Sequence, residues 1–274
     1  MRIETVNLDK GGGGKSSHSY NQAWWLALEK KKRVLLMDGD HSRNLTHSFE
    51  VNPSKTMYDL FTTGETEICK VSDYISIIAG DERLTDDQLD LNSRNNKYLQ
   101  LFMWISDHYE ELDRDFDYLL IDTHNDESLV TANFIAVADI VLGVTDASTN
   151  GFRAWLALQR FVEKIKSEAI DVISRKSYVQ AQPYLIGNKI EYFGNNVSDT
   201  CKQFLDVVNQ DPAFLGAVQK KELMARSLVV NQSVFEQKNL MSAKEKEQHS
   251  KFYGNIEYVY ENILQKLNGD QENG

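Results

Sequence analysis

Short apolar runs rich in β-branched residues alternate along the chain with longer segments of helical periodicity. The apolar runs predict strands, which lie at residues 2–8, 33–38, 74–79, 117–122, 139–145, 183–188 and 214–218. The segments between them predict helices, at residues 15–31, 56–62, 97–113, 127–137, 150–168, 197–209 and 243–267. Several strands are apolar at nearly every position, which is typical when helices cover both faces of a sheet. We therefore expect an α/β fold with a doubly wound, mainly parallel sheet flanked by helices.

The same pattern predicts one domain. No linker rich in proline or glycine interrupts residues 1–267, so we expect a single domain over this range. Within it, residues 80–96 ("GDERLTDDQLDLNSRNN") are polar and acidic and predict a solvated insertion. The last residues, 268–274, are polar enough to predict a disordered tail.

Composition narrows the class of protein. With 41% hydrophobic residues the chain can bury a full core. It has no apolar run near the roughly 20 residues of a membrane span, and it opens on "RIETVNL" without a charged and then apolar leader. We expect a cytoplasmic protein that does not enter a membrane. Cys69 and Cys201 form no C-x-x-C pair, so we expect free thiols.

The charge balance excludes one kind of nucleic-acid binding. Thirty basic residues stand against 41 acidic ones, which gives a net charge of −11. A whole-surface attraction to nucleic acid or to anionic lipid is excluded by this balance. Any contact with DNA must come from a local basic patch.

A glycine-rich stretch, "KGGGGKSS" at residues 10–17, lies between the first predicted strand and the first predicted helix. Glycines at such a junction let backbone N–H groups surround a phosphate, and the helix N-terminus adds a partial positive charge. Lys15 then reaches the β- and γ-phosphates, and the Ser16 hydroxyl binds Mg²⁺. The pattern G-x-x-x-x-G-K-[ST] is incomplete, because Asp9 occupies its first glycine position. The alternative is a flexible loop without a ligand.

The arrangement of residues 10–17 resembles the deviant Walker A motif, K-G-G-x-G-K-[ST]-[ST], of the ParA/MinD family of ATPases. The resemblance implies that Lys10 crosses to the ATP of a partner subunit, so that ATP binding produces a homodimer. A solvated lysine at the edge of a loop is the alternative for Lys10 alone. The resemblance also implies the residues that contact ATP: Gly11, Gly12, Gly13, Gly14, Lys15, Ser16 and Ser17.

Two acidic motifs extend the resemblance. In "RVLLMDGDHSRNLT", Asp38 and Asp40 lie at a strand end where the family has D-x-D. By resemblance, Asp40 orients the attacking water and Asp38 supports Mg²⁺ and the loop geometry. "FDYLLIDT" ends in Asp122, the form of a Walker B motif, which implies a magnesium ligand. The alternative for the first motif is a D-G-D turn whose side chains are solvated and bind no ligand.

Two further positions carry weaker signals. The family commonly continues after the Walker B motif with a proline pair, but this chain has "HNDES", and we interpret His124 as solvated or capping. Asn188 ends the strand "PYLIGN", where the family has a polar residue that contacts the base. Asn188 is therefore predicted to contact adenine, with a capping asparagine as the alternative.

A local excess of basic residues supplies the patch that DNA binding requires. Residues 216–251 hold seven basic and four acidic side chains. ParA-type proteins bind DNA without reading its sequence, and such binding depends on phosphate neutralisation. The predicted DNA contacts are Lys220, Lys221, Arg226 and Lys251. A solvated helix face is the alternative.

The last predicted helix bears on membrane binding, because MinD-type relatives enter the membrane surface through a C-terminal amphipathic helix. Here "FYGNIEYVYENILQKL" has an apolar stripe, but its polar face is acidic. A membrane helix favours lysine and arginine on that face. The stripe is therefore predicted to pack in the core.

The resemblance implies a ParA-like ATPase that partitions DNA, most simply a plasmid. ATP and Mg²⁺ would bring two subunits together, and the dimer would bind non-specific DNA and associate with the nucleoid. A ParB-like centromere-binding adaptor would stimulate a slow hydrolysis. Two alternatives remain open: a metabolic ATP-dependent ligase or synthetase of the same superfamily, and a nucleotide-gated scaffold that positions a cargo other than DNA.

Overall fold

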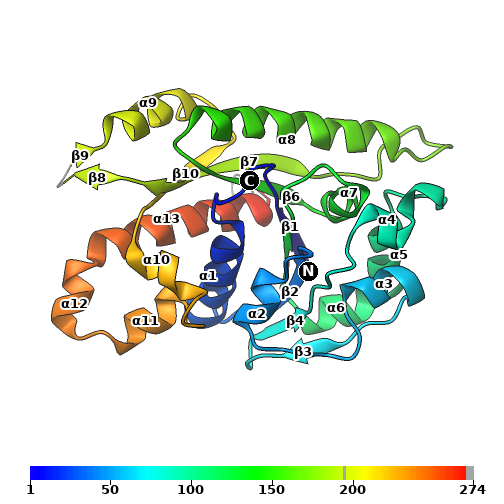
Figure 1. The fold of residues 1–274 in the computed structure, drawn as a ribbon, viewed down its shortest axis with the longest axis horizontal. Coiled ribbons are helices and arrows are strands. Elements are labelled where there is room, and N and C mark those ends of the chain that lie inside the picture. The colour runs from blue at the N-terminus through cyan, green and yellow to red at the C-terminus, as the bar shows by residue number, and fades with distance from the viewer. Residues whose placement is uncertain (194–195, 270–274) are drawn as a thin grey trace, which may run out of the picture.

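An eight-stranded sheet forms the centre of the computed structural model, which describes residues 1–193 and 196–269 (Figure 1). The strand order is β10-β7-β6-β1-β5-β2-β4-β3. β3 pairs antiparallel with β4, and the other neighbours in the sheet pair parallel. The strands are β1 (Arg2–Val6), β2 (Val34–Gly39), β3 (Ile68–Lys70), β4 (Ile75–Ile78), β5 (Tyr118–Thr123), β6 (Ile140–Asp146), β7 (Gln182–Ile190) and β10 (Phe214–Gln219). The predicted α/β class is confirmed.

Helices cover both faces of this sheet (Figure 1). The longer ones are α1 (Lys15–Leu28), α5 (Gln100–Asp107), α7 (Leu129–Ala136), α8 (Thr149–Glu168), α9 (Asp199–Val208) and α13 (Ser250–Leu267). Shorter ones are α2 (Asn44–Ser48), α3 (Met57–Thr63), α4 (Asp86–Leu89), α6 (Tyr109–Asp115), α10 (Glu222–Ser227), α11 (Val234–Leu240), α12 (Ala243–Gln248) and the 3-10 turn η1 (Leu91–Ser93). A small ribbon of β8 (Tyr192–Phe193) and β9 (Asn196–Val197) lies outside the main sheet.

Successive side chains of the buried strands point to opposite faces of the sheet, so they join separate cores beneath the two layers of helices. In β2, Leu36 joins the core beneath α1 and α13, whereas Leu35 joins the core beneath α3 and α5. Leu120 and Leu119 divide in the same way in β5. Every residue of β2 and β5 is buried, as the continuous apolar runs predict.

The last helix packs in the core, as predicted. Its apolar stripe is fully or nearly fully buried, at Ile256, Val259, Tyr260, Ile263 and Leu267. Among the described residues, no helix combines the length and the apolar character that crossing a membrane requires. Cys69 and Cys201 are free, as expected.

Several predicted boundaries are wrong. The helix expected over 97–113 is two helices, α5 and α6, because His108 leaves the helical backbone region. His249 separates α12 from α13 in the same way, so the helix expected over 243–267 is also double. The segment 80–96 is not solvated throughout, because Leu84, Leu89 and Leu91 are buried against the core beneath α3 and α5. The tail expected to be disordered lies, from residue 270 on, outside the described residues.

Candidate functional site

The sequence-predicted residues meet at one edge of the sheet. Strands β1, β2, β5, β6 and β7 run parallel, so their carboxyl ends share that edge. Ligands of open α/β sheets bind in this place. The glycine-rich loop follows β1, and the predicted side chains lie at or just beyond the ends of the other strands: Asp38 on β2, Asp40 directly after β2, Asp122 on β5 and Asn188 on β7.

The glycine-rich loop packs too closely for side chains at two positions. Gly14 has φ +99°, and a Cβ there would lie 2.4 Å from Asn188 Nδ2. A Cβ on Gly13 would lie 2.6 Å from the Val144 carbonyl oxygen. Only glycine fits at both positions without movement of the surroundings. The loop therefore has the tight backbone that a phosphate cradle requires.

Two side chains at the end of β7 hold this loop from outside. Asn188 Nδ2 donates a hydrogen bond to the Gly13 carbonyl at 2.8 Å, and Lys189 Nζ donates to the Gly12 carbonyl at 2.6 Å. These bonds occupy carbonyl oxygens and leave the N–H groups of the loop for a ligand. Asn188 thus positions the loop, and its contact with adenine stays a prediction. Sequence reasoning missed Lys189.

Lys15 is buried at the start of α1, with 7% of its surface exposed. Its Nζ donates to Asn125 Oδ1 at 3.0 Å and to the Leu8 carbonyl at 3.4 Å. Burial lowers the pKa of Lys15, and the carboxylates of Asp122 and Asp40 oppose this shift. Both of its hydrogen-bond partners are neutral oxygens, so the buried ammonium has charge to offer an anion such as phosphate. Sequence reasoning missed Asn125.

Asp38 and Asp122 face each other as register partners in β2 and β5, and both are fully buried. Burial raises the pKa of Asp38 to about 6, although Thr46 donates hydrogen bonds to it. Burial and the neighbouring Asp38 raise the pKa of Asp122 to about 7, whereas Ser16 and Lys15 lower it. Two buried acids side by side favour a nearby cation.

The two acids differ in their hydrogen bonds. Asp38 Oδ2 accepts from the Thr46 N–H at 2.7 Å and from the Thr46 hydroxyl at 2.6 Å, and Oδ1 accepts from the Asp40 N–H at 3.2 Å. Asp122 Oδ1 accepts from the Ser19 hydroxyl, at 3.3 Å. No donor among the described residues reaches Asp122 Oδ2, which is buried. An unpartnered buried carboxylate oxygen beside Ser16 fits a magnesium ligand, and Asp38 fixes the turn that carries Asp40.

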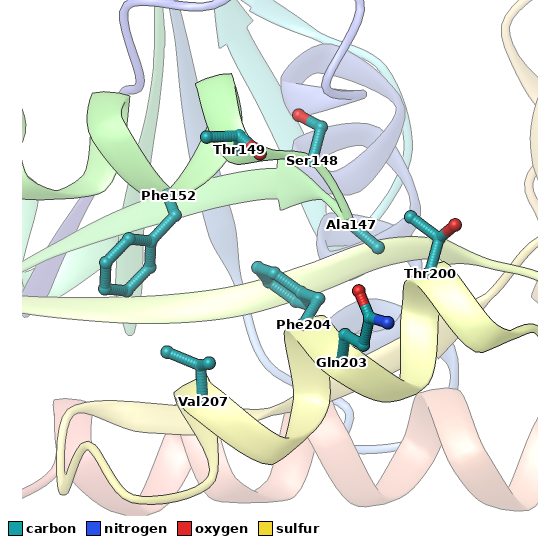
Figure 2. A pocket seen from close by; sticks show the side chains of 8 residues that line it. All are labelled: Ala147, Ser148, Thr149, Phe152, Thr200, Gln203, Phe204 and Val207. Atoms are coloured by element: carbon teal, nitrogen blue, oxygen red, sulfur yellow. The ribbon is translucent and has the colours of Figure 1, made fainter.

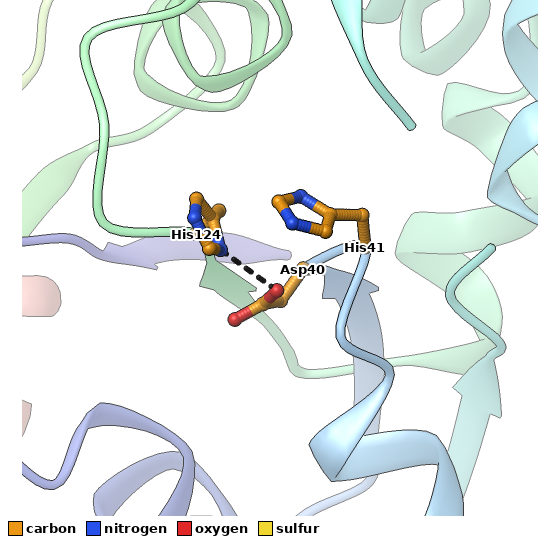
Figure 3. A group of neighbouring side chains, drawn as sticks. All are labelled: Asp40, His41 and His124. Atoms are coloured by element: carbon orange, nitrogen blue, oxygen red, sulfur yellow. Dashed lines mark hydrogen bonds and ion pairs between the residues drawn. The ribbon is translucent and has the colours of Figure 1, made fainter. Parts of the chain in front are cut away.

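Asp40 contacts His124 beyond the strand ends, and His41 lies beside this pair (Figure 3). Its Oδ1 accepts from the Ser42 N–H at 2.7 Å and lies 2.9 Å from His124 Nδ1. The His41 and His124 rings lie 4.0 Å apart between centroids, tilted by 40°. Burial raises the pKa of Asp40, but the bonds from Ser42 and His124 outweigh it and hold the pKa below its ordinary value. The interpretation of His124 as solvated or capping is therefore wrong.

Lys10 is bound within its own chain. Its Nζ forms an ion pair with Asp146 and donates to the Ser148 hydroxyl at 2.7 Å. The side chain is 19% exposed, so the alternative of a solvated lysine is wrong. The contact of Lys10 with a partner's ATP stays a prediction.

A cavity of about 420 Å³ opens beside the glycine-rich loop. Its lining comprises Gly14, Ser17, Asn188, Lys189, Gln219, Lys220, Lys221, Met224 and Ala225. Lys220 Nζ also pairs with Glu191 at 2.6 Å. Two of the four predicted DNA contacts thus line this cavity, whereas Arg226 lies on α10 and Lys251 lies in the first turn of α13. Their role toward DNA stays a prediction.

A second pocket, of about 250 Å³, lies between the start of α8 and α9 (Figure 2). Phe152 and Phe204 line its apolar part, with Val207 at the far end. Ser148, which binds Lys10, also lines it. The pocket therefore borders the segment that holds Lys10.

Comparison with known proteins agrees with this geometry. Residues 1–176 match the model of a family described as AAA domain. An uncharacterized ATP-binding protein of Methanocaldococcus jannaschii is 25% identical over 235 residues, which cover 82% of this chain and 81% of that protein. The chromosome partitioning protein ParA of Myxococcus xanthus is 28% identical over 148 residues, which cover 52% of this chain and 50% of that protein.

Solved structures share the fold over most of the chain. Apo McdA from Cyanothece has a TM-score of 0.79 at 19% identity and covers 96% of this chain and 99% of its own. A putative plasmid partition protein from Borrelia burgdorferi, bound to AMPPNP, has a TM-score of 0.74 at 19% identity over 97% of this chain and 99% of its own. Cobyrinic acid a,c-diamide synthase from Mycobacterium smegmatis, with an ATP analog and magnesium, has a TM-score of 0.64 at 18% identity over 77% of this chain and 80% of its own. At these identities the likeness shows a shared fold.

Proposed function

The chain belongs to the AAA domain family whose model matches residues 1–176, with the fold of the ParA/MinD type of P-loop ATPases, and we propose that it is a ParA-like ATPase that partitions DNA. One observation carries the ATPase assignment. Lys15 and the unpartnered Oδ2 of Asp122 are buried together at the base of a loop whose Gly13 and Gly14 leave no room for side chains. This combination supplies a cation, a metal ligand and backbone donors for a triphosphate.

Each residue of the loop has a proposed task. Gly11, Gly12, Gly13 and Gly14 surround the phosphates together with Lys15, Ser16 and Ser17, and Asn188 fixes the loop next to the base. Ser16 and Asp122 hold Mg²⁺, and Asp38 supports them through the turn it fixes. Bound Mg²⁺ would neutralise charge on the phosphates during transfer.

Asp40 orients the water that attacks the γ-phosphate. The hydrogen bonds from Ser42 and His124 fix its carboxylate in one direction. The same bonds hold its pKa below the ordinary value, so Asp40 is a good hydrogen-bond acceptor and a weak base. Hydrolysis is therefore slow, so the lifetime of bound ATP can set how long the dimer persists.

ATP binding couples to dimerisation through Lys10. In the proposed dimer, Lys10 of each subunit leaves Asp146 and contacts the triphosphate in the other subunit. Dimerisation doubles the basic residues that face DNA, so the ATP-bound dimer binds non-specific DNA more tightly than one subunit does. The proposed contacts are Lys220, Lys221, Arg226 and Lys251. A ParB-like centromere-binding adaptor would stimulate hydrolysis and release the dimer from the nucleoid.

The pocket between α8 and α9 favours a second candidate, a synthetase of the same superfamily. Such an enzyme needs a place for a second substrate, and this pocket has a volume of about 250 Å³ near the loop. Turnover of ATP would then respond to a small molecule and not to DNA.

An Asp40→Ala variant distinguishes the two candidates. Because it should bind ATP and not hydrolyse it, it should accumulate as an ATP-bound dimer. This variant should shift an arbitrary duplex DNA in a gel with ATP and not without it, and the shift should weaken steeply across a salt series. Absence of an ATP-dependent shift at low salt would exclude the partition role and favour the synthetase or a scaffold for another cargo.

A further inference from the structure

We propose that Asp40, His41 and His124 form a binding site for a divalent transition-metal ion such as Zn²⁺, separate from the magnesium site at Asp122. Among the described residues, these three form a group of histidine and carboxylate side chains that could hold one metal ion (Figure 3). One ligand atom from each residue lies within 4.8 Å of the other two.

Strand pairing brings the three side chains together. β2 and β5 are parallel neighbours, and Gly39 is the register partner of Thr123. The residues that follow these partners, Asp40 and His124, therefore leave the sheet side by side, and His41 comes next after Asp40. Asp40 Oδ1 and His124 Nδ1 are already 2.9 Å apart. The cluster is a consequence of the sheet and needs no rearrangement of the backbone.

The ligand set selects the class of metal. Two imidazoles and one carboxylate suit Zn²⁺ and related borderline ions, whereas Mg²⁺ prefers oxygen ligands. Bonds of about 2.0–2.2 Å to a tetrahedral ion place its ligand atoms about 3.4 Å apart. Ligand atoms within 4.8 Å reach that spacing by small side-chain rotations. Three protein ligands leave a fourth position for water, as in open zinc sites.

The cluster is accessible yet held in place. The His124 side chain is 27% exposed and that of Asp40 is 8% exposed, so an ion can enter from the histidine side. The Ser42 N–H fixes the Asp40 carboxylate at 2.7 Å. A fixed carboxylate with two partly exposed imidazoles is a site that an ion can enter without unfolding of the loop.

Occupancy of this site has a consequence that rests on the proposed function. A bound transition-metal ion would take the carboxylate of Asp40, which otherwise orients the attacking water. ATP hydrolysis would slow, while Lys15 and the glycine-rich loop would still bind the nucleotide.

Direct binding of Zn²⁺ tests the site without reference to ATP. The full chain, freed of metal, is titrated with Zn²⁺ by calorimetry in excess Mg²⁺ and without nucleotide. One ion per chain should bind to the parent protein. Loss of a residue that only hydrogen-bonds to a metal ligand typically weakens metal binding by about 10-fold to 100-fold. His41→Ala and His124→Ala each remove a ligand itself, so each should weaken Zn²⁺ binding by at least this factor. Circular dichroism confirms that each variant is folded.

His47→Ala is the matched control, because His47 is an exposed histidine on the nearby α2 and lies outside the cluster. Its Zn²⁺ affinity should equal that of the parent. Equal affinities in the parent and in folded His41→Ala and His124→Ala, or no saturable binding at all, would overturn the proposal.

A hydrolysis assay separates this site from the proposed function. Zn²⁺ should inhibit ATP hydrolysis by the parent protein and by His47→Ala, and His41→Ala should need at least about 10-fold more Zn²⁺ for the same inhibition. Binding through the cluster without inhibition would support the metal site and overturn the role of Asp40 in hydrolysis.

Discussion

Lys10 is held within its own subunit by Asp146. The Lys10 ammonium pairs with this carboxylate and also donates to the Ser148 hydroxyl at 2.7 Å. Asp146 is the last residue of β6, and Ser148 caps α8. Under the proposed function, Lys10 must leave both partners before it can contact a second subunit. The pair therefore competes with dimerisation.

Asp146→Asn should strengthen the ATP-dependent dimer. Partly exposed ion pairs contribute about 0.2–1 kcal/mol, so loss of two copies per dimer should raise the association constant about two-fold to thirty-fold. Sedimentation with a non-hydrolysable ATP analogue measures this. Asp115→Asn, which removes a surface pair with Arg114, is the control and should leave dimerisation unchanged. A weaker dimer in Asp146→Asn would contradict the competition.

The two lysines that flank the glycines should have separable effects. Lys15→Ala should abolish ATP binding, because it removes the buried ammonium at the base of the loop. Lys10→Ala should still bind nucleotide but stay monomeric, because its contact is with the other subunit. Fluorescent-nucleotide binding and sedimentation measure the two properties. Equal dimerisation of Lys10→Ala and the parent would refute the role of Lys10 across the interface.

Gly14→Ala should disrupt the loop. The new methyl group would lie 2.4 Å from Asn188 Nδ2, on a backbone with φ +99°. A strained backbone of this kind costs about 1–3 kcal/mol, and displacement of Asn188 should also abolish ATP binding. Gly254→Ala is the control, because Gly254 lies within α13 with open space around its Cβ position. It should raise the free energy of unfolding by about 1 kcal/mol. An ATP affinity of Gly14→Ala equal to that of the parent would contradict the requirement for glycine at this position.

Glu4 on β1 and His18 on α1 form a buried pair. Glu4 Oε1 lies 4.0 Å from His18 Nε2, and Gln22 donates to the other Glu4 oxygen at 2.7 Å. Neither Glu4 Oε1 nor His18 Nε2 has a hydrogen-bond partner among the described residues. Tyr260, in edge contact with His18, stays neutral because burial raises its pKa far above the ordinary value. Burial raises the pKa of Glu4 from 4.5 to about 7 and lowers the pKa of His18 from 6.5 to about 3.

These shifts give the two groups opposite effects on stability. Folded Glu4 keeps a proton that the unfolded chain releases. Its contribution to the free energy of unfolding is therefore lost as the pH rises from about 4.5 to about 7. Unfolded His18 takes a proton that the folded protein excludes, so its contribution is lost as the pH falls from about 6.5 to about 3. Glu4→Gln should remove the first effect alone.

Urea denaturation across this pH range checks the prediction. The free energy of unfolding of Glu4→Gln, relative to the parent, should increase as the pH rises from about 4.5 to about 7. Glu261→Gln, which changes a surface glutamate paired with Lys30, is the control and should show no such trend. A difference between Glu4→Gln and the parent that stays constant with pH would contradict the buried proton.

The sheet could be predicted because β2 and β5 are apolar at nearly every position and the helices between strands carry a regular apolar stripe. The helix ends were less predictable. His108 and His249 each change the backbone direction within an uninterrupted helical pattern, and nothing in residue type marks them. Leu84, Leu89 and Leu91 were missed as core residues because acidic residues surround them in the sequence.

The residues of the site that belong to a local sequence motif could be predicted. The contacts between residues that are far apart in the sequence, which depend on the order of strands in the sheet, could not. Lys15 and Asp122 follow from their motifs, although their roles stay predictions. The contact of His124 with Asp40 joins residues 84 positions apart, and that of Lys10 with Asp146 joins residues 136 positions apart. Both arise from the neighbours each strand has in the sheet. A histidine two or three residues beyond each of two predicted strand ends was the one available signal for the metal cluster.

The bonds from Asn188 and Lys189 to the carbonyls of Gly13 and Gly12 hold the loop in its shape without a nucleotide. The conformational entropy of its glycines is thus lost before a nucleotide arrives. Preorganisation of this kind removes an ordering cost from the affinity for ligand. Binding should then be rapid and accompanied by little change in heat capacity, and the larger structural response should be confined to the association of subunits.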